Sequence, residues 1–266
     1  MKSIKYLLIA SVLLLSCEET VSPPEIENIE DLLVVNSILN PTDSIYYVEV
    51  TWSNPSFGLL PDFEDEFVTN AIVTISDGSR QEAFVYETQQ RRYELDAERF
   101  PIEPGATYQL TVSANGQEAF ATASTKTGVP LVESFEFRNS RDLSISWKDL
   151  EGSEDFYTVT AFLKREEQDF TNLIPYFFES GFVSDRNRDG SILQDTGEGF
   201  ESPRSMDTLL VTLYSYNELY VDYFEILENY IGDDPFSEPV QLPSNIQGGL
   251  GIFAIVQQSD FKMRAR

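Results

Sequence analysis

Short alternating segments separated by turn residues are the feature that most constrains how this chain can fold. The segment SIYYVEVTW at residues 44–52 places Tyr46 and Val48 on one face, and apolar residues at every second position are typical of a half-buried strand. NAIVTISDG at residues 70–78 alternates in the same way and ends in Asp-Gly, which is a hairpin signal. Such strands, with turn signals about every ten residues, predict an all-β, mainly antiparallel protein built from β-sandwiches.

The pattern occurs in two blocks, so we expect two sandwich units. The first, at residues 31–128, has the strand spacing of an immunoglobulin-like sandwich. The second, at residues 129–266, begins after a Gly-Val-Pro turn, and its Trp147 followed by the strand with Tyr157 resembles a fibronectin type III domain. Any antiparallel sheet with aromatic residues in its core gives the same two residues, and that alternative stays open.

Two features interrupt the strands of the second unit. Residues 166–205 are rich in Phe, Gly and Asp, and we expect an irregular loop excursion there, since long ordered loops are often functional. Residues 218–231 form the one predicted helix, with Asn217 as its N-cap and Gly232 placed to end it. The apolar face that we expect this helix to pack on a sheet comprises Tyr220, Phe224, Leu227 and Ile231. Residues 249–258 are predicted as the closing strand.

The N-terminus carries a targeting signal. Lys2 and Lys5 precede an apolar stretch too short to span a bilayer of about 30 Å, so residues 1–16 are predicted to be a cleaved signal peptide. The sequence Leu-Leu-Ser-Cys that ends at Cys17 resembles a bacterial lipobox, which implies a covalent lipid on Cys17 and a membrane anchor. An ordinary secretory signal is the alternative. Residues 17–30 are acidic and contain two prolines, and we expect them to be a tether.

Composition excludes several classes of chemistry. The chain has no histidine and one cysteine, and lipidation of Cys17 would leave the mature protein without a free thiol. Histidine-dependent catalysis, imidazole metal ligands, disulfides and thiolate zinc sites are therefore excluded. The formal net charge of −27, from 45 acidic and 18 basic residues, repels nucleic acid, so no nucleic-acid partner is expected.

The sharpest candidate for a ligand site is DRNRDGSILQD at residues 185–195. Asp-x-Asn-x-Asp-Gly opens a calcium loop, in which alternate side chains converge on one cation and the glycine permits a sharp turn. Oxygen ligands suit a hard cation and require neither His nor Cys. The predicted calcium ligands are Asp185, Asn187, Asp189, Ser191 and Asp195. Position twelve is Thr196 instead of the bidentate Glu of an EF-hand, and an unmetallated turn rich in Asp and Asn is the alternative.

Other features that bear on chemistry are less specific. Acidic residues are abundant, but no motif selects a pair for glycoside hydrolysis. The aromatic run Tyr176, Phe177 and Phe178 can stack on a sugar or contact a partner, and the alternative is a small core under a loop. Gly248 and Gly249 precede a strand, where glycine permits positive φ and close backbone approach, so we assign the pair to the fold.

The C-terminal stretch YFEILENYIGDDPFSEPVQLPSNIQGGLGIF, at residues 223–253, carries a family resemblance. Together with the lipobox, LLVVNSILNP, NAIVTISDG and PGATYQLTVS in that order, it resembles lipoproteins of the Bacteroidota grouped as domain of unknown function 4249. The resemblance implies an outer-membrane lipoprotein, often encoded near TonB-dependent transporters, and it assigns no catalytic residues. Glu18 and Glu19, just after Cys17, resemble the Bacteroidota signal for export to the cell surface.

These observations favour a non-enzymatic surface lipoprotein that is anchored in the outer membrane through Cys17. It would act as a binding or accessory component beside a TonB-dependent transporter. Two alternatives stay open. One is a calcium-dependent polysaccharide hydrolase that uses carboxylate catalysis, and the other is an adhesin or structural surface protein.

Overall fold

The computed structural model describes residues 31–53, 66–139, 141–152, 154–166, 173–230 and 241–264. These residues are mostly antiparallel β-strands and belong to one compact unit that begins at Asp31. The predicted signal peptide, Cys17 and the tether at 17–30 lie outside the described residues. Within the described ranges, no helix is both long and apolar enough to cross a membrane.

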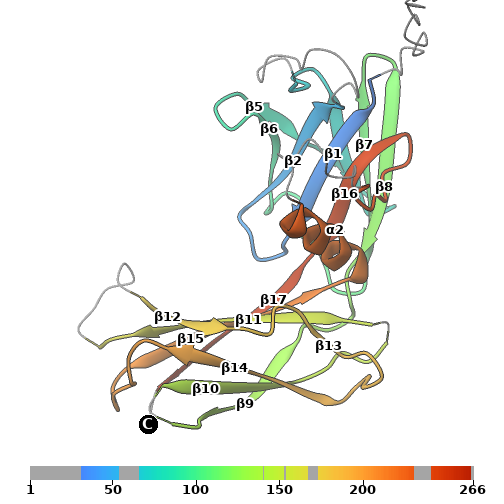
Figure 1. Cartoon of the computed structure of the whole chain (residues 1–266). Helices are drawn as coiled ribbons and strands as arrows, with labels where there is room; N and C mark the ends of the chain where they lie inside the picture. Colours follow the sequence, from blue (N-terminus) through green and yellow to red (C-terminus); the bar gives the residue numbers. More distant parts are fainter. Residues whose placement is uncertain are drawn as a thin grey trace, which may run out of the picture. The chain divides into compact units, whose positions relative to one another are not determined.

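The first sandwich packs two sheets against each other. Its strands are β1 (Leu33–Leu39), β2 (Ile45–Trp52), β3 (Ile72–Ser76), β4 (Gln81–Ala83), β5 (Val85–Glu87), β6 (Arg92–Asp96), β7 (Thr107–Ala114), β8 (Gln117–Ser124) and β16 (Gly249–Ile255). The 5-stranded sheet has the order β16-β1-β2-β6-β5, and the 4-stranded sheet has the order β4-β3-β7-β8 (Figure 1). The alternation predicted for residues 44–52 is confirmed, because Tyr46 and Val48 of β2 are buried in the core between the sheets.

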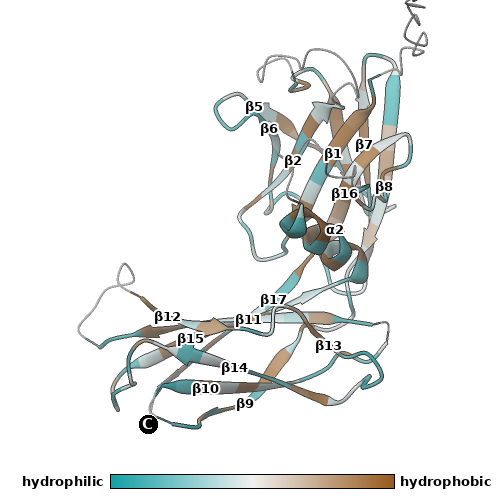
Figure 2. Ribbon diagram, in the orientation of Figure 1, coloured by the Kyte–Doolittle hydropathy of each residue, from teal (hydrophilic) through white to brown (hydrophobic). Residues whose placement is uncertain are grey.

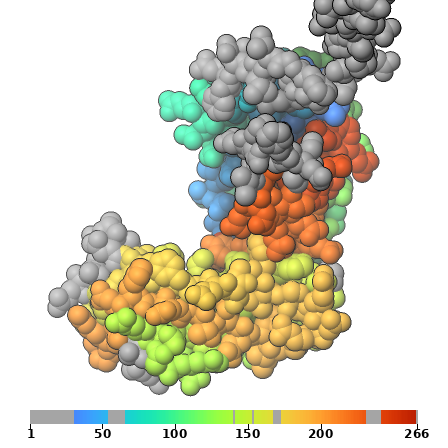
Figure 3. Space-filling model, viewed as in Figure 1, coloured from blue at the N-terminus to red at the C-terminus, as the bar shows by residue number. Residues whose placement is uncertain are grey.

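Strand β16 reaches the first sandwich from near the end of the chain. It pairs in parallel with β1, from Leu33 opposite Gly249 to Leu39 opposite Ile255. Just before β16, Gln247 forms a β-bridge with a residue of β8, so this segment lies between the edges of the two sheets. Figure 2 shows β1 and β16 as largely hydrophobic, and in Figure 3 the orange and red C-terminal residues lie among the blue and green of this sandwich.

Close backbone packing explains the glycines at the start of β16. Gly248 has a φ of +78°, and a Cβ there would lie 2.3 Å from the carbonyl oxygen of Glu118. A Cβ at Gly249 would lie 2.4 Å from the carbonyl oxygen of Leu33. Only glycine fits both places without displacing backbone, so the structural role predicted for the pair is confirmed.

The second sandwich is one hydrogen-bonded sheet that folds over itself. Its strands are β9 (Leu131–Phe137), β10 (Asp142–Lys148), β11 (Phe156–Lys164), β12 (Ile174–Phe178), β13 (Val183–Ser184), β14 (Ile192–Gly199), β15 (Thr208–Tyr216) and β17 (Gln257–Arg264). Their order is β17-β15-β11-β12-β14-β10-β9, and β13 pairs with β11 (Figure 1). Buried residues from both ends of this order share one core, so the two halves of the sheet face each other. Trp147 and Tyr157 are fully buried in that core, with ring centroids 5.6 Å apart.

The prediction of an irregular excursion at residues 166–205 is wrong. This stretch contains β12, β13 and β14, which complete the second sandwich. The apolar alternation that predicts a strand is interrupted in β14, because Gly197 and Gly199 occupy inward positions where a strand usually carries apolar side chains. The rings of Phe178 and Tyr176, from the paired strand β12, cover these two glycines.

The prediction of one closing strand at residues 249–258 is also wrong. Strand β16 ends at Ile255 in the first sandwich, and β17 begins at Gln257 in the second. The predicted second unit at 129–266 therefore contains a strand of the first sandwich. Alternation along the chain cannot reveal that β16 belongs to the first sandwich, because the parallel pairing of β1 with β16 joins segments at opposite ends of the chain.

Helix α2 (Glu218–Asn229) is the one helix among the described residues. Asn217 caps it as predicted, since its side-chain oxygen accepts a hydrogen bond of 2.9 Å from the N–H of Tyr220. The helix is slightly shorter than the predicted span of 218–231, and Tyr230 is its C-cap. The glycine predicted to end it lies outside the described residues.

The buried face of α2 differs from the predicted stripe. Val221 and Tyr223 are its buried residues, and Tyr223 packs with Ile252 and Ala254 of β16. Of the predicted stripe, Tyr220 and Phe224 are half-buried, Leu227 is 44% exposed, and Ile231 lies outside the described residues. Aromatic contacts also hold the helix, because the ring of Tyr220 stacks on the ring of Tyr216 in β15 at 4.5 Å between centroids.

Candidate functional site

Three carboxylates gather beside strands β10 and β14. Asp149 directly follows β10, and Asp185 and Asp189 belong to the loop between β13 and β14. One carboxylate oxygen from each residue lies within 4.8 Å of the others. The antiparallel pairing of β10 with β14 brings the loop to this place, and the N–H of Asp149 donates to the carbonyl oxygen of Ser191 at 2.9 Å. We call Asp149, Asp185 and Asp189 the carboxylate cluster.

Hydrogen bonds orient the two buried members of the cluster. Asp149 accepts a bond of 2.7 Å from the N–H of Gly190 and another of 2.7 Å from the hydroxyl of Tyr157. Asp185 accepts a bond of 3.0 Å from the N–H of Asp155. Such bonds to an ionised carboxylate are stronger than bonds between neutral groups, so they fix where the oxygens point.

A fourth carboxylate, Asp155, lies beside the cluster and is fully buried. Burial raises the pKa of Asp155 to about 6. The ammonium group of Lys126, 2.6 Å from the Asp155 carboxylate, acts in the opposite direction, and the charges of Asp149 and Asp185 add to the increase. Burial also raises the pKa of Asp185, and the charge of Asp149 adds to that shift. The cluster therefore concentrates negative charge where water stabilises it poorly.

The structure gathers some of the predicted calcium ligands and not others. Asp185 and Asp189 both belong to the carboxylate cluster. Asn187 is exposed with a φ of +63°, and the hydroxyl of Ser191 is buried without a hydrogen-bond partner among the described residues. Asp195 lies within β14 and does not belong to the cluster.

Sequence patterns missed two residues of this region. Asp149 and Asp155 come from the connection between β10 and β11, which is distant in sequence from the predicted loop. In the sequence, both residues belong to the acidic run KDLEGSED at residues 148–155. Alternation does not show which strands pair with the two strands that flank this run. Strand pairing brings the two connections together, and spacing along the chain does not show it.

The cluster offers carboxylate oxygens beside a cavity, and the neighbouring carboxyl group of Asp155 is buried. Carboxylate oxygens are the ligands that calcium takes, and Asp149 also lines a cavity of about 350 Å³ with Lys126 and Lys148. A general acid has to reach its substrate, either directly or through one water. The carboxyl group with the raised pKa of about 6 belongs to Asp155, whose side chain is 0% exposed.

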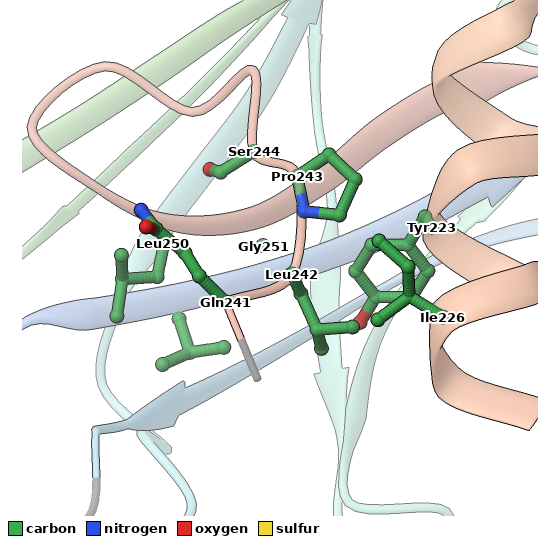
Figure 4. A pocket seen from close by; sticks show the side chains of 9 residues that line it. Tyr223, Ile226, Gln241, Leu242, Pro243, Ser244, Leu250 and Gly251 are labelled. Carbon is green, nitrogen blue, oxygen red and sulfur yellow. The ribbon is translucent and has the colours of Figure 1, made fainter. Parts of the chain in front are cut away.

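A larger and apolar cavity, of about 610 Å³, lies beside α2 on the first sandwich (Figure 4). This volume falls in the range of roughly 300–1,000 Å³ that is usual for ligand pockets. Elements distant in sequence form it: α2, β1, β16 and the segment at residues 241–244. We call it the apolar pocket, and its lining residues are Val34, Tyr223, Ile226, Gln241, Leu242, Pro243, Ser244, Leu250 and Gly251.

Few polar groups face the apolar pocket. Burial raises the pKa of Tyr223, so its hydroxyl stays protonated and is 3.5 Å from the side-chain oxygen of Asn36. Gln241 and Ser244 are exposed lining residues from the same segment. Gly251 has a φ of +109°, and a Cβ there would lie 2.2 Å from the carbonyl oxygen of Val35, so glycine is needed here for the close approach of β16 to β1. Apolar walls with a few polar groups are typical of sites that bind small molecules or single side chains.

Sequence patterns did not predict the apolar pocket. The spacing of Tyr223 and Ile226 on the helix was available as a signal, as was the Leu-Pro pair at 242–243. Both were compatible with ordinary core packing, and the opposite wall comes from β1, at the other end of the chain.

The strand order defines an all-β protein of two β-sandwiches, the second with the fibronectin type III-like arrangement. Residues 18–262 match the family described as domain of unknown function (DUF4249), and the chain belongs to that family. No curated protein matches the chain.

Several solved structures match the chain at low sequence identity. A two-domain fibronectin type III segment of chicken tenascin is 16% identical, with 70% of this chain and 91% of that chain covered and a TM-score of 0.24. The FN1–FN3 domains of chicken CNTN1 are 15% identical, with 87% and 69% covered and a TM-score of 0.30. A cytokine receptor complex is 9% identical, with 87% and 95% covered and a TM-score of 0.25. At such low scores the fold assignment rests on the strand order alone.

Proposed function

We propose that this chain is a non-enzymatic, lipid-anchored binding protein of the outer membrane. The Leu-Leu-Ser-Cys sequence supports an anchor at Cys17, and the acidic pair Glu18 and Glu19 supports display on the cell surface. Residues 17–30 would then serve as the tether between the lipid and the first strand. In this arrangement the sandwiches stand next to a TonB-dependent transporter and hold a ligand or contact the barrel.

The apolar pocket is the observation that carries the binding function. Its cavity of about 610 Å³ is walled mainly by apolar side chains, and Leu250 remains 43% exposed there. A contiguous apolar surface facing water is a feature that often marks a binding site. The polar groups at its edge, including Tyr223 and Gln241, can orient a bound group without reacting with it.

Copurification tests the proposed partner. The full chain carrying an affinity tag, solubilised from its own membranes, should retain a TonB-dependent barrel transporter. Leu250→Arg should reduce that retention severalfold, because a buried charge opposes an apolar contact. Val85→Arg is the matched control, since Val85 is 66% exposed on β5 of the same sandwich. A chain that purifies without any transporter would contradict the proposal.

Metabolic labelling tests the anchor separately. Labelled palmitate should enter the wild-type chain and should be absent from Cys17→Ser, which should also leave the membrane fraction. Labelling that persists in Cys17→Ser, or a wild-type chain without label, would overturn the lipid anchor.

Calcium binding is a second candidate function, favoured by the carboxylate oxygens within 4.8 Å of one another. Calorimetry of the full chain in detergent should detect calcium binding, and Asp185→Asn combined with Asp189→Asn should abolish it. Asp222→Asn, on the exposed side of α2, is the control. The absence of heat with the wild-type chain would end this candidate.

A hydrolase and an adhesin would each be revealed by a different measurement. Turnover on a panel of polysaccharides, lost in Asp149→Asn, would establish a hydrolase, because Asp149 is the cluster residue that lines a cavity. Binding to immobilised extracellular matrix, with no effect of the chain on nutrient uptake, would establish an adhesin.

A further inference from the structure

Two phenylalanines face solvent on the second sandwich. Phe177 of β12 is 52% exposed, and Phe200, just after β14, is 67% exposed. Their ring centroids are 5.1 Å apart and the rings are inclined at 69°, so the edge of one ring meets the face of the other. The pair therefore leaves at least one face of each ring uncovered by the other ring.

The local strand geometry explains why Phe177 points outward. Tyr176 and Phe178 fill the inward positions of β12 and lie over Gly199 and Gly197 of the paired strand. Alternation along the strand then places Phe177 on the outer face. Neither it nor Phe200 belongs to the core of the second sandwich, so packing does not account for either exposed ring.

Charged side chains complete a small cavity around the rings. The cavity has a volume of about 190 Å³ and is lined by Arg141, Phe177, Glu179, Glu198, Gly199 and Phe200. Glu198 lies directly opposite Phe177 in the strand pairing. Within the described ranges, the side chains of Arg141, Glu179 and Glu198 form no ion pair or hydrogen bond. Donors and acceptors are thus both available for a ligand.

We infer that this cavity binds one neutral sugar ring of a glycan. A pyranose ring presents an apolar C–H face, which matches the open faces of Phe177 and Phe200, and a polar edge of hydroxyl groups. Hydroxyl groups both donate and accept hydrogen bonds, so they match the guanidinium of Arg141 and the two carboxylates together. The volume of about 190 Å³ fits a single ring and its substituents.

The mixed charge of the cavity disfavours other ligands. An anion would face the carboxylates of Glu179 and Glu198, and a cation, although it would meet these carboxylates and the rings, would also face the guanidinium of Arg141. A purely apolar group would desolvate all three charged side chains without replacing their hydrogen bonds with water. The site is separate from the apolar pocket, so this inference does not depend on the transporter as a partner.

Calorimetry of the full chain in detergent tests the inference. The neutral probes are maltohexaose, xylohexaose and mannohexaose, and the charged probes are hexagalacturonate and choline. At least one neutral probe should bind, and Phe177→Ala or Phe200→Ala should weaken its binding by about tenfold or more in Kd. Ile192→Ala is the matched control, because Ile192 is also an apolar residue of the second sandwich, 62% exposed on β14.

Four results would overturn the inference. They are the absence of binding by every neutral probe, binding by the charged probes alone, binding of a neutral probe that Phe177→Ala leaves unchanged, and equal weakening by Ile192→Ala. Both phenylalanines are exposed, so their variants should keep the wild-type Tm, and this measurement separates a lost contact from a lost fold.

Discussion

The two sandwiches complete their sheets in different ways. The second uses strands that follow one another along the chain, apart from β17, and its two halves join where β12 pairs with β14. The first depends on β16, which comes after nearly all of the second sandwich and pairs in parallel with β1. The integrity of the first sandwich therefore depends on a segment near the C-terminus, whereas that of the second depends mainly on local connections.

The carboxylate cluster and the apolar pocket also differ in how far apart in the sequence their residues lie. The carboxylate cluster is made by two connections within the second sandwich, and its residues are largely buried and hydrogen-bonded. The apolar pocket is made by α2, β16 and the segment at 241–244, all of which reach the first sandwich from the C-terminal part of the chain. Loss of β16 should thus remove the pocket together with the first core and leave the cluster in place.

The largest loss of stability is expected from Gly248→Ala, and this variant tests whether the first sandwich requires β16. A Cβ at Gly248 would lie 2.3 Å from a backbone oxygen, so the free energy of unfolding should fall by about 3–5 kcal/mol. Gly78→Ala is the control, because Gly78 also has positive φ, +85°, but no atom lies within 4 Å of its Cβ. Its cost should be about 1 kcal/mol. Equal costs in denaturant titrations would mean that the close approach of β16 is not required.

A smaller change in the free energy of unfolding, of about 3 kcal/mol, is expected from the buried carboxyl group of Asp155 in the second sandwich. Burial raises the pKa of Asp155 from 3.8 to about 6, so the folded state holds a proton more tightly than the unfolded state between these values. The free energy of unfolding should therefore decrease as pH rises through this window, and the contribution should be lost above pH 6 or so. Asp155→Asn should reduce this slope, and the raised pKa of Asp185 should leave a remainder of the same sign.

Denaturant titrations at several pH values measure that slope. Asp222→Asn is the control, because Asp222 is exposed on α2. A slope that is identical in wild-type protein and Asp155→Asn would show that the buried carboxyl does not titrate in this range.

The smallest loss of stability is expected from a change of the N-cap of α2. Asn217→Ala removes the hydrogen bond of 2.9 Å to the N–H of Tyr220 and should cost about 1 kcal/mol. Because α2 forms one wall of the apolar pocket, hydrogen exchange should also become faster in the helix. Asn217→Asp should restore most of the stability, since aspartate is an equally good cap, and a variant with alanine that is as stable as the wild type would contradict the role of this cap.

Local chemistry in the sequence was sufficient to predict many elements of this fold. Alternation found the strands around Tyr46 and Trp147, the cap rule found Asn217, and the glycine pair was correctly assigned to close backbone approach. These features depend on residues within a few positions of one another. The predictions failed where inward positions carry glycine, as at Gly197 and Gly199, because the side chain that fills the space belongs to a neighbouring strand.

The candidate sites were less predictable for the same reason. The loop with Asp185 and Asp189 was found by its spacing, but Asp149 and Asp155 join it only through strand pairing. The wall of the apolar pocket contributed by β1 was equally hidden, since it faces residues from the other end of the chain. A pattern along the sequence cannot show which distant residues share a cavity.

Photo-crosslinking in living cells tests the central claim most directly. A photoreactive amino acid at position 250, in the wall of the apolar pocket, should crosslink the chain to a TonB-dependent barrel transporter. The same group at position 85, which is 66% exposed on β5 of the same sandwich, should yield little of that product. No transporter crosslink from position 250, or equal crosslinks from the two positions, would contradict the account of this chain as a binding protein that acts through the apolar pocket.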